Sequence, residues 1–357
     1  MDRIGLVGLP NSGKSALFNA LTGGGAVVAP RPFSTTETEV GVAHVPDERL
    51  DALAQMSKSR RVVRSGFEVV DIAGVQPSGE RGSNLGARFL AGAREVDALA
   101  LVLRSFTDDA APGGSDPAQA LAELELELVI ADAGALEAQL QRKRKVTDQS
   151  VAGALEAAPR ALSILQSGTP LYRSSLSDGD RAALRPLFLL TNKAVVAIVN
   201  VGEDQVDDSS VVDEVRAELG HPGAVGVLAV SVQLESEAAR LDAGERAELL
   251  EGLGLGEGAL VRVARAAYET LGRDTFLTTG DKESRAWTFR RGALAPECAG
   301  VIHSDLQRGF IKADVIYWSD LLEAGSFANA RARGKVRLEG KDYAVRDGDV
   351  LEIRFNV

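Results

Sequence analysis

The stretch "GLPNSGKS" at residues 8–15 constrains the fold of this chain more than any other. Gly8 and Gly13 flank four residues, and Lys14 and Ser15 follow, which is the spacing of a phosphate-binding loop. Glycines are needed there because backbone N–H groups must converge on phosphate oxygens without obstruction by a Cβ atom. The apolar run "RIGLVGL" leads into the loop and the helix-compatible "SALFNALT" leaves it, which argues against a chance match. We expect Lys14 to face the β- and γ-phosphates of a nucleotide and Ser15 to bind Mg²⁺ through its hydroxyl.

Two further motifs decide which class of phosphate-binding protein this is. "DIAG" at 71–74 fits D-x-x-G, in which Asp71 would hold Mg²⁺ through water and the Gly74 amide would contact the γ-phosphate. "PFSTTE" lies between the two motifs, where a switch loop belongs, and Thr35 is the expected Mg²⁺ ligand there, with Thr36 as its rival. Three motifs in this order predict a switch NTPase rather than a nucleotide kinase. The residues expected to carry catalysis are Lys14, Thr35 and Gly74.

The sequence indicates less directly which base of the nucleotide the site would recognise. Switch GTPases read guanine with N-K-x-D at the end of a strand, and "TNKAV" at 191–195 begins in that way. However, Val195 stands where Asp is required, and the segment precedes an apolar strand instead of ending it. That strand ends at "NVGE", where Asn200 takes the structural role and Glu203 takes the base-reading position. Glutamate in place of aspartate weakens the case for GTP, although a glutamate can still accept hydrogen bonds from guanine. "SVQ" at 231–233 is a candidate to close over the base. The expected nucleotide contacts are Asn11, Ser12, Gly13, Lys14, Ser15, Ala16, Asn200, Val201, Glu203, Ser231 and Val232.

Length and charge set the wider frame. A chain of 357 residues with 45% hydrophobic residues is long enough for two globular domains. No apolar run reaches membrane-spanning length, and the single Cys298 can form no intrachain disulfide, so we expect a cytoplasmic setting without a membrane partner. The net charge of -11 argues against a surface that coats nucleic acid generally. Residues 276–357 differ, because they carry 13 Lys/Arg against 12 Asp/Glu, a net charge of +1. The rest of the chain carries 27 Lys/Arg against 39 Asp/Glu, a net charge of -12.

Apolar runs alternate with helical stretches over the first three quarters of the chain, which predicts an α/β fold with a doubly wound, mostly parallel sheet. Beyond the first strand, the expected strands are 66–74, 97–106, 194–201 and 224–232. Between the second and third of these, leucines recur near helical spacing, so we expect an inserted helical hairpin whose second arm is interrupted or begun by Pro159. Short strands with Gly and Asp-Gly turns then predict a second domain after about residue 275.

With these residues assembled, the chain resembles the YchF family, the Obg-like ATPases within the Obg branch of translation-factor-type P-loop proteins. "GLPNSGKSALFNALT", "VVDIAGV", "NLGARFLA" and "RAWTFRRGALAPECAGVIHSDLQRGFIKADVI" carry the resemblance, which covers essentially the whole chain. It implies an Obg-type G domain at 1–275, a coiled-coil hairpin inserted at about 112–188, and a C-terminal TGS domain of β-grasp fold at 276–357. The family carries N-x-x-E where ordinary GTPases carry N-K-x-D. The resemblance therefore implies ATP as substrate, GTP as the alternative, Mg²⁺, and a ribosome or ribosomal RNA partner.

Some positions depart from the expected pattern. Val75 follows "DIAG", where many switch GTPases have a glutamine that orients the attacking water. The resemblance places a histidine proposed for that task at Leu101, and a cysteine at Ser105. Asn11 is a candidate K⁺ ligand beside the phosphates, or else a residue that stabilises the loop by a hydrogen bond. Two functions remain open: a slow ATPase switch, or a nucleotide-regulated ribosome- or RNA-binding module with negligible hydrolysis. A monomer is expected in both cases.

Overall fold

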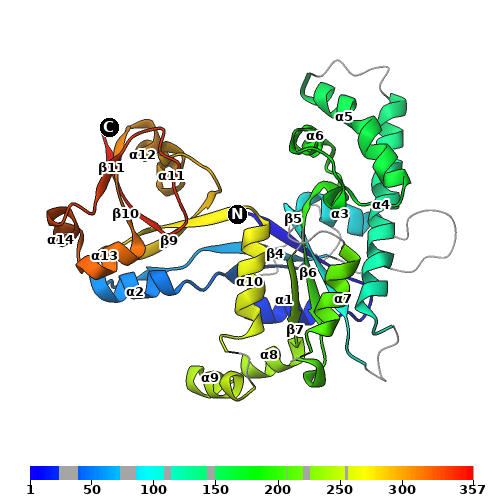
Figure 1. Ribbon diagram of the computed structural model, residues 1–357, viewed down its shortest axis with the longest axis horizontal. Helices are drawn as coiled ribbons and strands as arrows, with labels where there is room; N and C mark the ends of the chain where they lie inside the picture. Colours follow the sequence, from blue (N-terminus) through cyan, green and yellow to red (C-terminus); the bar gives the residue numbers. More distant parts are fainter. Residues whose placement is uncertain are drawn as a thin grey trace. The chain divides into compact units, whose positions relative to one another are not determined.

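The computed structural model describes residues 1–23, 39–72, 86–107, 114–142, 149–206, 208–219, 226–253 and 256–356. Its contacts divide the chain into two compact units, coloured along the sequence in Figure 1. Unit 1 consists of Met1–Ala43 and Glu68–Leu271, and unit 2 of His44–Phe67 and Gly272–Val357.

Unit 1 is built on a six-stranded sheet with the order β2-β4-β1-β5-β6-β7. The strands are β1 (Arg3–Val7), β2 (Glu39–His44), β4 (Gly66–Asp71), β5 (Ala98–Arg104), β6 (Ala194–Asn200) and β7 (Gly226–Val230). β1 pairs in parallel with β4 and β5, and β6 pairs in parallel with β5 and β7. Every residue of β5 is buried, because the centre of a parallel sheet is covered on both faces. The predicted doubly wound sheet is therefore confirmed.

The helices of unit 1 connect these strands and cover the sheet (Figure 1). Outside the insertion they are α1 (Lys14–Leu21), α3 (Ala87–Glu95), α7 (Ser210–Leu219), α8 (Val232–Ala238), α9 (Ala243–Gly252) and α10 (Ala259–Thr270), with the single-turn η5 (Glu203–Gln205). α10 has the clearest amphipathic pattern, since Leu260, Val263, Ala264 and Ala267 recur at helical spacing and are all buried. It packs against β6 and β7.

The predicted helical hairpin lies between β5 and β6. Its elements are α4 (Pro117–Arg142), α5 (Gln149–Gln166), η2 (Leu171–Arg173), α6 (Asp178–Leu184), η3 (Arg185–Leu187) and η4 (Leu190–Asn192). α4 belongs to two cores: Leu121 and Leu128 pack with the residues of the sheet, whereas Leu136 packs with Ala161 of α5. Pro159 lies inside α5, so the expectation that it interrupts or begins a helix was wrong.

Unit 2 is built on a mixed sheet with the order β11-β10-β12-β8-β9-β3. The strands are β3 (Val62–Val63), β8 (Arg273–Thr278), β9 (Ser284–Arg290), β10 (Phe310–Tyr317), β11 (Arg337–Glu339) and β12 (Asp349–Phe355). The helices are α2 (Glu48–Ser57), α11 (Ala295–Ile302), α12 (Ser304–Arg308), α13 (Trp318–Ala324) and α14 (Phe327–Ala332). β8 and β9 form an antiparallel hairpin, and β12 lies parallel to β8 and antiparallel to β10, which is the strand arrangement of a β-grasp fold.

Both faces of this second sheet are covered. Phe276 and Leu277 are neighbours on β8, so their side chains point to opposite faces. Phe276 joins a core that contains Cys298 of α11, and Leu277 joins a core that contains Leu50 of α2 and Leu321 of α13.

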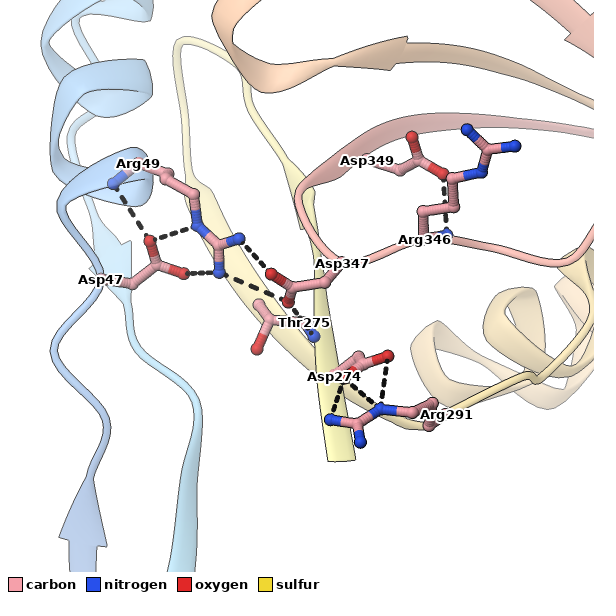
Figure 2. A network of polar contacts seen from close by, with 8 residues as sticks. All are labelled: Asp47, Arg49, Asp274, Thr275, Arg291, Arg346, Asp347 and Asp349. Atoms are coloured by element: carbon pink, nitrogen blue, oxygen red, sulfur yellow. Dashed lines mark hydrogen bonds and ion pairs between the residues drawn. The ribbon is translucent and has the colours of Figure 1, made fainter. Parts of the chain in front are cut away.

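The segment His44–Phe67 is the main difference from the expected organisation, because a division near residue 275 would assign it to the first domain. In the structure it packs within unit 2, where β3 pairs in parallel with β9. Figure 2 shows a polar network that fastens it there. Arg49 contacts Asp47 at 2.8 Å and Asp347 at 2.5 Å, and Asp347 accepts a hydrogen bond of 2.9 Å from the backbone N–H of Thr275.

Candidate nucleotide-binding site

The loop between β1 and α1 has a backbone that requires glycine. Gly13 precedes α1 with a left-handed φ of 85°, and a Cβ atom built on it would lie 2.1 Å from the side-chain nitrogen of Asn200. A Cβ atom on Gly8 would lie 2.8 Å from the carbonyl oxygen of Val102. Asn11 also takes a left-handed φ, of 63°. The spacing of the two glycines therefore reflects close approaches of β5 and β6 to the loop.

The first and second motifs meet at one point. The Ser15 hydroxyl donates to Asp71 Oδ2 at 2.6 Å, and the Lys14 ammonium contacts Asp71 Oδ1. The Lys14 and Asp71 side chains are only 11% and 10% exposed. The contact arises because β1 and β4 are parallel neighbours, so the residues that follow them emerge at the same edge of the sheet.

This arrangement suits Mg²⁺ and a polyphosphate. A hydroxyl and a carboxylate oxygen are hard donors of the type that Mg²⁺ binds, with the remaining positions filled by water and phosphate oxygens. The described residues contain no group of three or more His, Cys, Asp or Glu side chains placed to hold a metal by themselves. Ser12 Oγ is buried and has no hydrogen-bond partner among the described residues, so the loop retains a polar atom suited to a bound ligand.

Asn200 at the end of β6 braces the loop. Its side-chain N–H donates to the carbonyl oxygen of Ser12 at 3.1 Å, and its side-chain oxygen accepts from the N–H of Val232 at 3.2 Å. The residue is 4% exposed. It thereby joins the phosphate loop to the start of α8, which is the structural role expected from its place in "NVGE".

The base-reading residues expected from the sequence lie at the ends of two parallel neighbours, β6 and β7. Val201 is buried, whereas Glu203 is exposed and begins η5. Ser231 precedes α8 as its N-cap and accepts from the N–H of Leu234 at 3.5 Å. Glu203 and Ser231 therefore emerge at the same edge of the sheet as Lys14.

One residue of this edge was missed by the sequence interpretation. Gln205 accepts hydrogen bonds from the N–H of Gly202 at 3.1 Å and from the Ser105 hydroxyl at 3.3 Å. It thus fixes the turn that carries Glu203 and links it to the end of β5. A polar residue two positions after Glu203 is the only signal that the sequence offered, and it is a weak one.

"TNKAV" lies at the amino end of β6, away from this edge. Asn192 belongs to η4 and donates to the carbonyl oxygen of Arg181 at 2.9 Å. Lys193 donates to the carbonyl oxygen of Arg94 at 3.0 Å, and burial lowers the pKa of Lys193 to about 8. Neither residue reads a base, in agreement with the interpretation that they belong to a loop.

Comparisons with known proteins bear on the same site. The family model YchF-GTPase_C, described as "Protein of unknown function (DUF933)", matches residues 274–356. A second model, described as "50S ribosome-binding GTPase", matches residues 3–148. The chain is 40% identical to the "Ribosome-binding ATPase YchF" of Bacillus subtilis over 361 aligned positions, which cover 99% of each chain.

The chain belongs to the YchF family. The protein of the same name from Pasteurella multocida is 42% identical, again over 99% of each chain. The solved structure of the Schizosaccharomyces pombe YchF GTPase superimposes with a TM-score of 0.84 at 29% identity and covers 99% of this chain and 97% of that one. The P-loop G domain and the YchF-type C-terminal domain expected from the sequence are therefore confirmed.

Position 101 in this YchF-family chain is buried in the sheet. Leu101 lies in the middle of β5, where it pairs with Val7 and Ala197, and it is 0% exposed in the hydrophobic core. That Leu101 stands in the place of a water-orienting side chain stays a prediction. Thr35, Thr36, Gly74 and Val75 lie outside the described residues.

Proposed function

We propose that this YchF-family protein binds ATP with Mg²⁺ at the Gly8–Ser15 loop, hydrolyses it slowly, and associates with the ribosome. The observation that carries the proposal is the contact of Lys14 and Ser15 with Asp71, which brings an ammonium group and two Mg²⁺-binding oxygens to the loop. The names of its relatives as ribosome-binding ATPases support the nucleotide and the ribosomal partner.

Catalysis in such a site rests on position and charge more than on covalent chemistry. Ser15, Asp71 and Thr35 would hold Mg²⁺, which neutralises phosphate charge when bound. Lys14 and the loop amides, including those of Gly13 and Ala16, would bind the β- and γ-phosphates. Gly74 would sense the γ-phosphate, so that the switch segment responds to the state of the nucleotide. A K⁺ ion at Asn11 stays a prediction.

The side chain of Glu203 favours ATP over GTP in this proposal. The Asp of N-K-x-D accepts from two guanine donors, the N1–H and the 2-amino group, and adenine offers neither in that geometry. A carboxylate that is one methylene longer is not matched to both donors. Side-by-side titration of the purified protein with labelled ATP and labelled GTP tests this directly, and tighter binding of GTP would contradict the preference.

Glu203→Asp is expected to move the ratio of ATP to GTP affinity towards GTP by about tenfold, or 1.4 kcal/mol. The shortened carboxylate would then occupy the position of the aspartate in N-K-x-D. Asp204→Glu is the matched control, because Asp204 is an exposed neighbour in the same turn and should leave the ratio unchanged. Equal ratios for Glu203→Asp and the wild type would show that Glu203 does not read the base.

A nucleotide-regulated binding module without turnover is the second candidate. Val75 favours it, because a hydrophobic residue at that position cannot orient water by hydrogen bonding. A multiple-turnover assay of phosphate release, with and without ribosomal subunits, separates the two functions. Release in either condition supports the ATPase, whereas its absence in both leaves only the binding module.

We also propose how the two units correspond to domains. Unit 1 would be the Obg-type G domain with its helical hairpin, and unit 2 the TGS domain, enlarged by His44–Phe67. No helix of the described residues combines the length and the apolar character that crossing a bilayer requires. A cytoplasmic location fits a ribosomal partner, and the monomeric state stays a prediction.

A further inference from the structure

The two units carry opposite net charges. Unit 2 contains 19 Lys/Arg and 16 Asp/Glu, a net charge of +3, whereas unit 1 contains 21 and 35, a net charge of -14. Part of the positive charge of unit 2 comes from His44–Phe67, which supplies five Lys/Arg against three Asp/Glu. The contacts that place this segment in unit 2 therefore also make that unit basic.

The excess charge of unit 2 gathers at one edge of its sheet. There the chain after α2 runs beside the turn between β8 and β9: Arg60 N–H donates to the carbonyl oxygen of Asp281 at 3.1 Å, and Ser284 N–H donates to that of Arg61 at 2.9 Å. We call this surface the basic edge, and its cations are Lys58, Arg60, Arg61, Arg64, Lys282 and Arg285. The acidic residues among them are Asp51, Asp281 and Glu283, so this surface accounts for a net charge of +3.

Half of these cations are not neutralised within the fold. Arg64 pairs with Asp51 at 2.6 Å, and Arg61 and Arg285 share Glu283 at 3.6 and 2.9 Å. The other three are exposed and form no ion pair with the described residues; they are Lys58, Arg60 and Lys282.

The opposite edge, near β11, is different. Arg331, Lys335 and Arg337 there each pair with a carboxylate of unit 2. Cations that already have partners gain little from a further anion, because the new contact must replace the old one. Lys312, Arg333 and Lys341 are also exposed and form no ion pair with the described residues, but residues 310–357 carry eight Lys/Arg against eight Asp/Glu and have no net charge. The basic edge differs because its exposed, unpaired cations lie on a surface with a net charge of +3.

We propose that the basic edge binds the phosphate backbone of ribosomal RNA. The proposal rests on the proposed association with the ribosome and names the surface that makes the contact. Exposed Lys and Arg side chains bind RNA by neutralising phosphates and releasing counterions, without reading the sequence. The unpaired side chains of Lys58, Arg60 and Lys282 are suited to this role.

Protection of the sheet edge from association is a weaker explanation for so many cations. Charged residues do prevent edge strands from pairing with other chains, but a very short strand achieves the same end. β3, at this edge, has only two residues. It therefore needs few charges for protection, whereas the surface around it carries six.

The test is the triple variant Lys58→Gln, Arg60→Gln and Lys282→Gln in the full-length protein. The matched control is Lys312→Gln, Arg333→Gln and Lys341→Gln, which removes three exposed cations of unit 2 from β10 and the segments that flank β11. Both variants change the net charge equally. ATP affinity and thermal unfolding show that each variant is folded, co-sedimentation measures binding to purified 70S ribosomes, and fluorescence anisotropy measures binding to protein-free ribosomal RNA across a salt titration.

We expect the first variant to bind ribosomes and ribosomal RNA at least about tenfold more weakly, and the slope of log affinity against log salt to fall by about one for each lost phosphate contact. The control should bind as the wild type does.

Equal weakening of both variants, or of neither, would overturn the basic edge as the contact while the proposed function stands. Loss of ribosome binding with unchanged affinity for protein-free RNA would assign the edge to an acidic ribosomal protein and overturn the RNA proposal. Failure of the wild type to bind ribosomes would instead contradict the proposed function.

Discussion

Lys14→Ala is expected to weaken ATP binding by at least about 100-fold, because it removes two charge-assisted hydrogen bonds to phosphate oxygens that contribute roughly 1.5–3 kcal/mol each. The geometry makes the loss more severe. Asp71 lies against Lys14, so removal of the ammonium group leaves an uncompensated carboxylate beside the γ-phosphate position. Titration with a labelled ATP analogue in the presence of Mg²⁺ measures the effect.

The control for this variant is Arg216→Ala. Arg216 is a half-exposed cation of α7 in the same unit, where it pairs with Asp213, and its loss should change ATP affinity by less than about twofold. Unchanged ATP affinity in a folded Lys14→Ala variant would show that the loop does not hold the phosphates.

The glycines of the phosphate-binding loop could be recognised from the sequence because their motif is local. A loop that must bring backbone N–H groups together requires glycine at fixed spacing, and Gly8 and Gly13 are both found where a Cβ atom would clash. The direct contact of Lys14 and Ser15 with Asp71 was not predicted, although the rule that parallel neighbouring strands end at the same edge accounts for it.

The features that the sequence did not reveal depend on contacts between distant segments. β3 has two residues, too few to show a periodicity, and its partner β9 lies more than 200 residues further along the chain. The position of Leu101 was equally hidden, because a fully buried parallel strand has no polar face by which its orientation can be read. At Pro159, the packing of Ala157, Ala158 and Ala161 offsets the lost backbone hydrogen bond, and α5 continues.

A buried carboxylate of the hairpin was also missed. Asp132 on α4 is 2% exposed, and it accepts hydrogen bonds from the N–H of Leu190 at 2.9 Å, the N–H of Thr191 at 2.7 Å and the Thr191 hydroxyl at 2.7 Å. The spacing contained a signal, because Leu128, Asp132 and Leu136 are four residues apart and share the buried face of α4. A charged residue on a buried helix face requires a hydrogen-bond or ion-pair partner.

Asp132→Ala is expected to lower the free energy of unfolding by about 3–5 kcal/mol, since it leaves three buried donors without an acceptor. The donors belong to η4, which leads directly into β6 and hence to Asn200, so the same variant should weaken ATP binding. Denaturant unfolding and ATP titration measure the two effects. Glu123→Ala is the control, because Glu123 is exposed on the same helix and should cost less than about 0.5 kcal/mol.

The dependence on pH gives Asp132 a test that a loss of packing would not pass. Burial raises the pKa of Asp132 above its ordinary value, although its hydrogen bonds oppose the shift. The folded state therefore holds this proton more tightly than the unfolded state, whose carboxyl titrates near about pH 3.9. The stabilisation from the protonated form is fully present below that pH and is lost as the pH rises through the higher pKa of the folded state. The unfolding free energy of the wild type minus that of Asp132→Asn should accordingly fall across this window. A difference that stays constant would mean that the carboxylate is as favourable in the fold as in water, and that the three donors of η4 fully offset its burial.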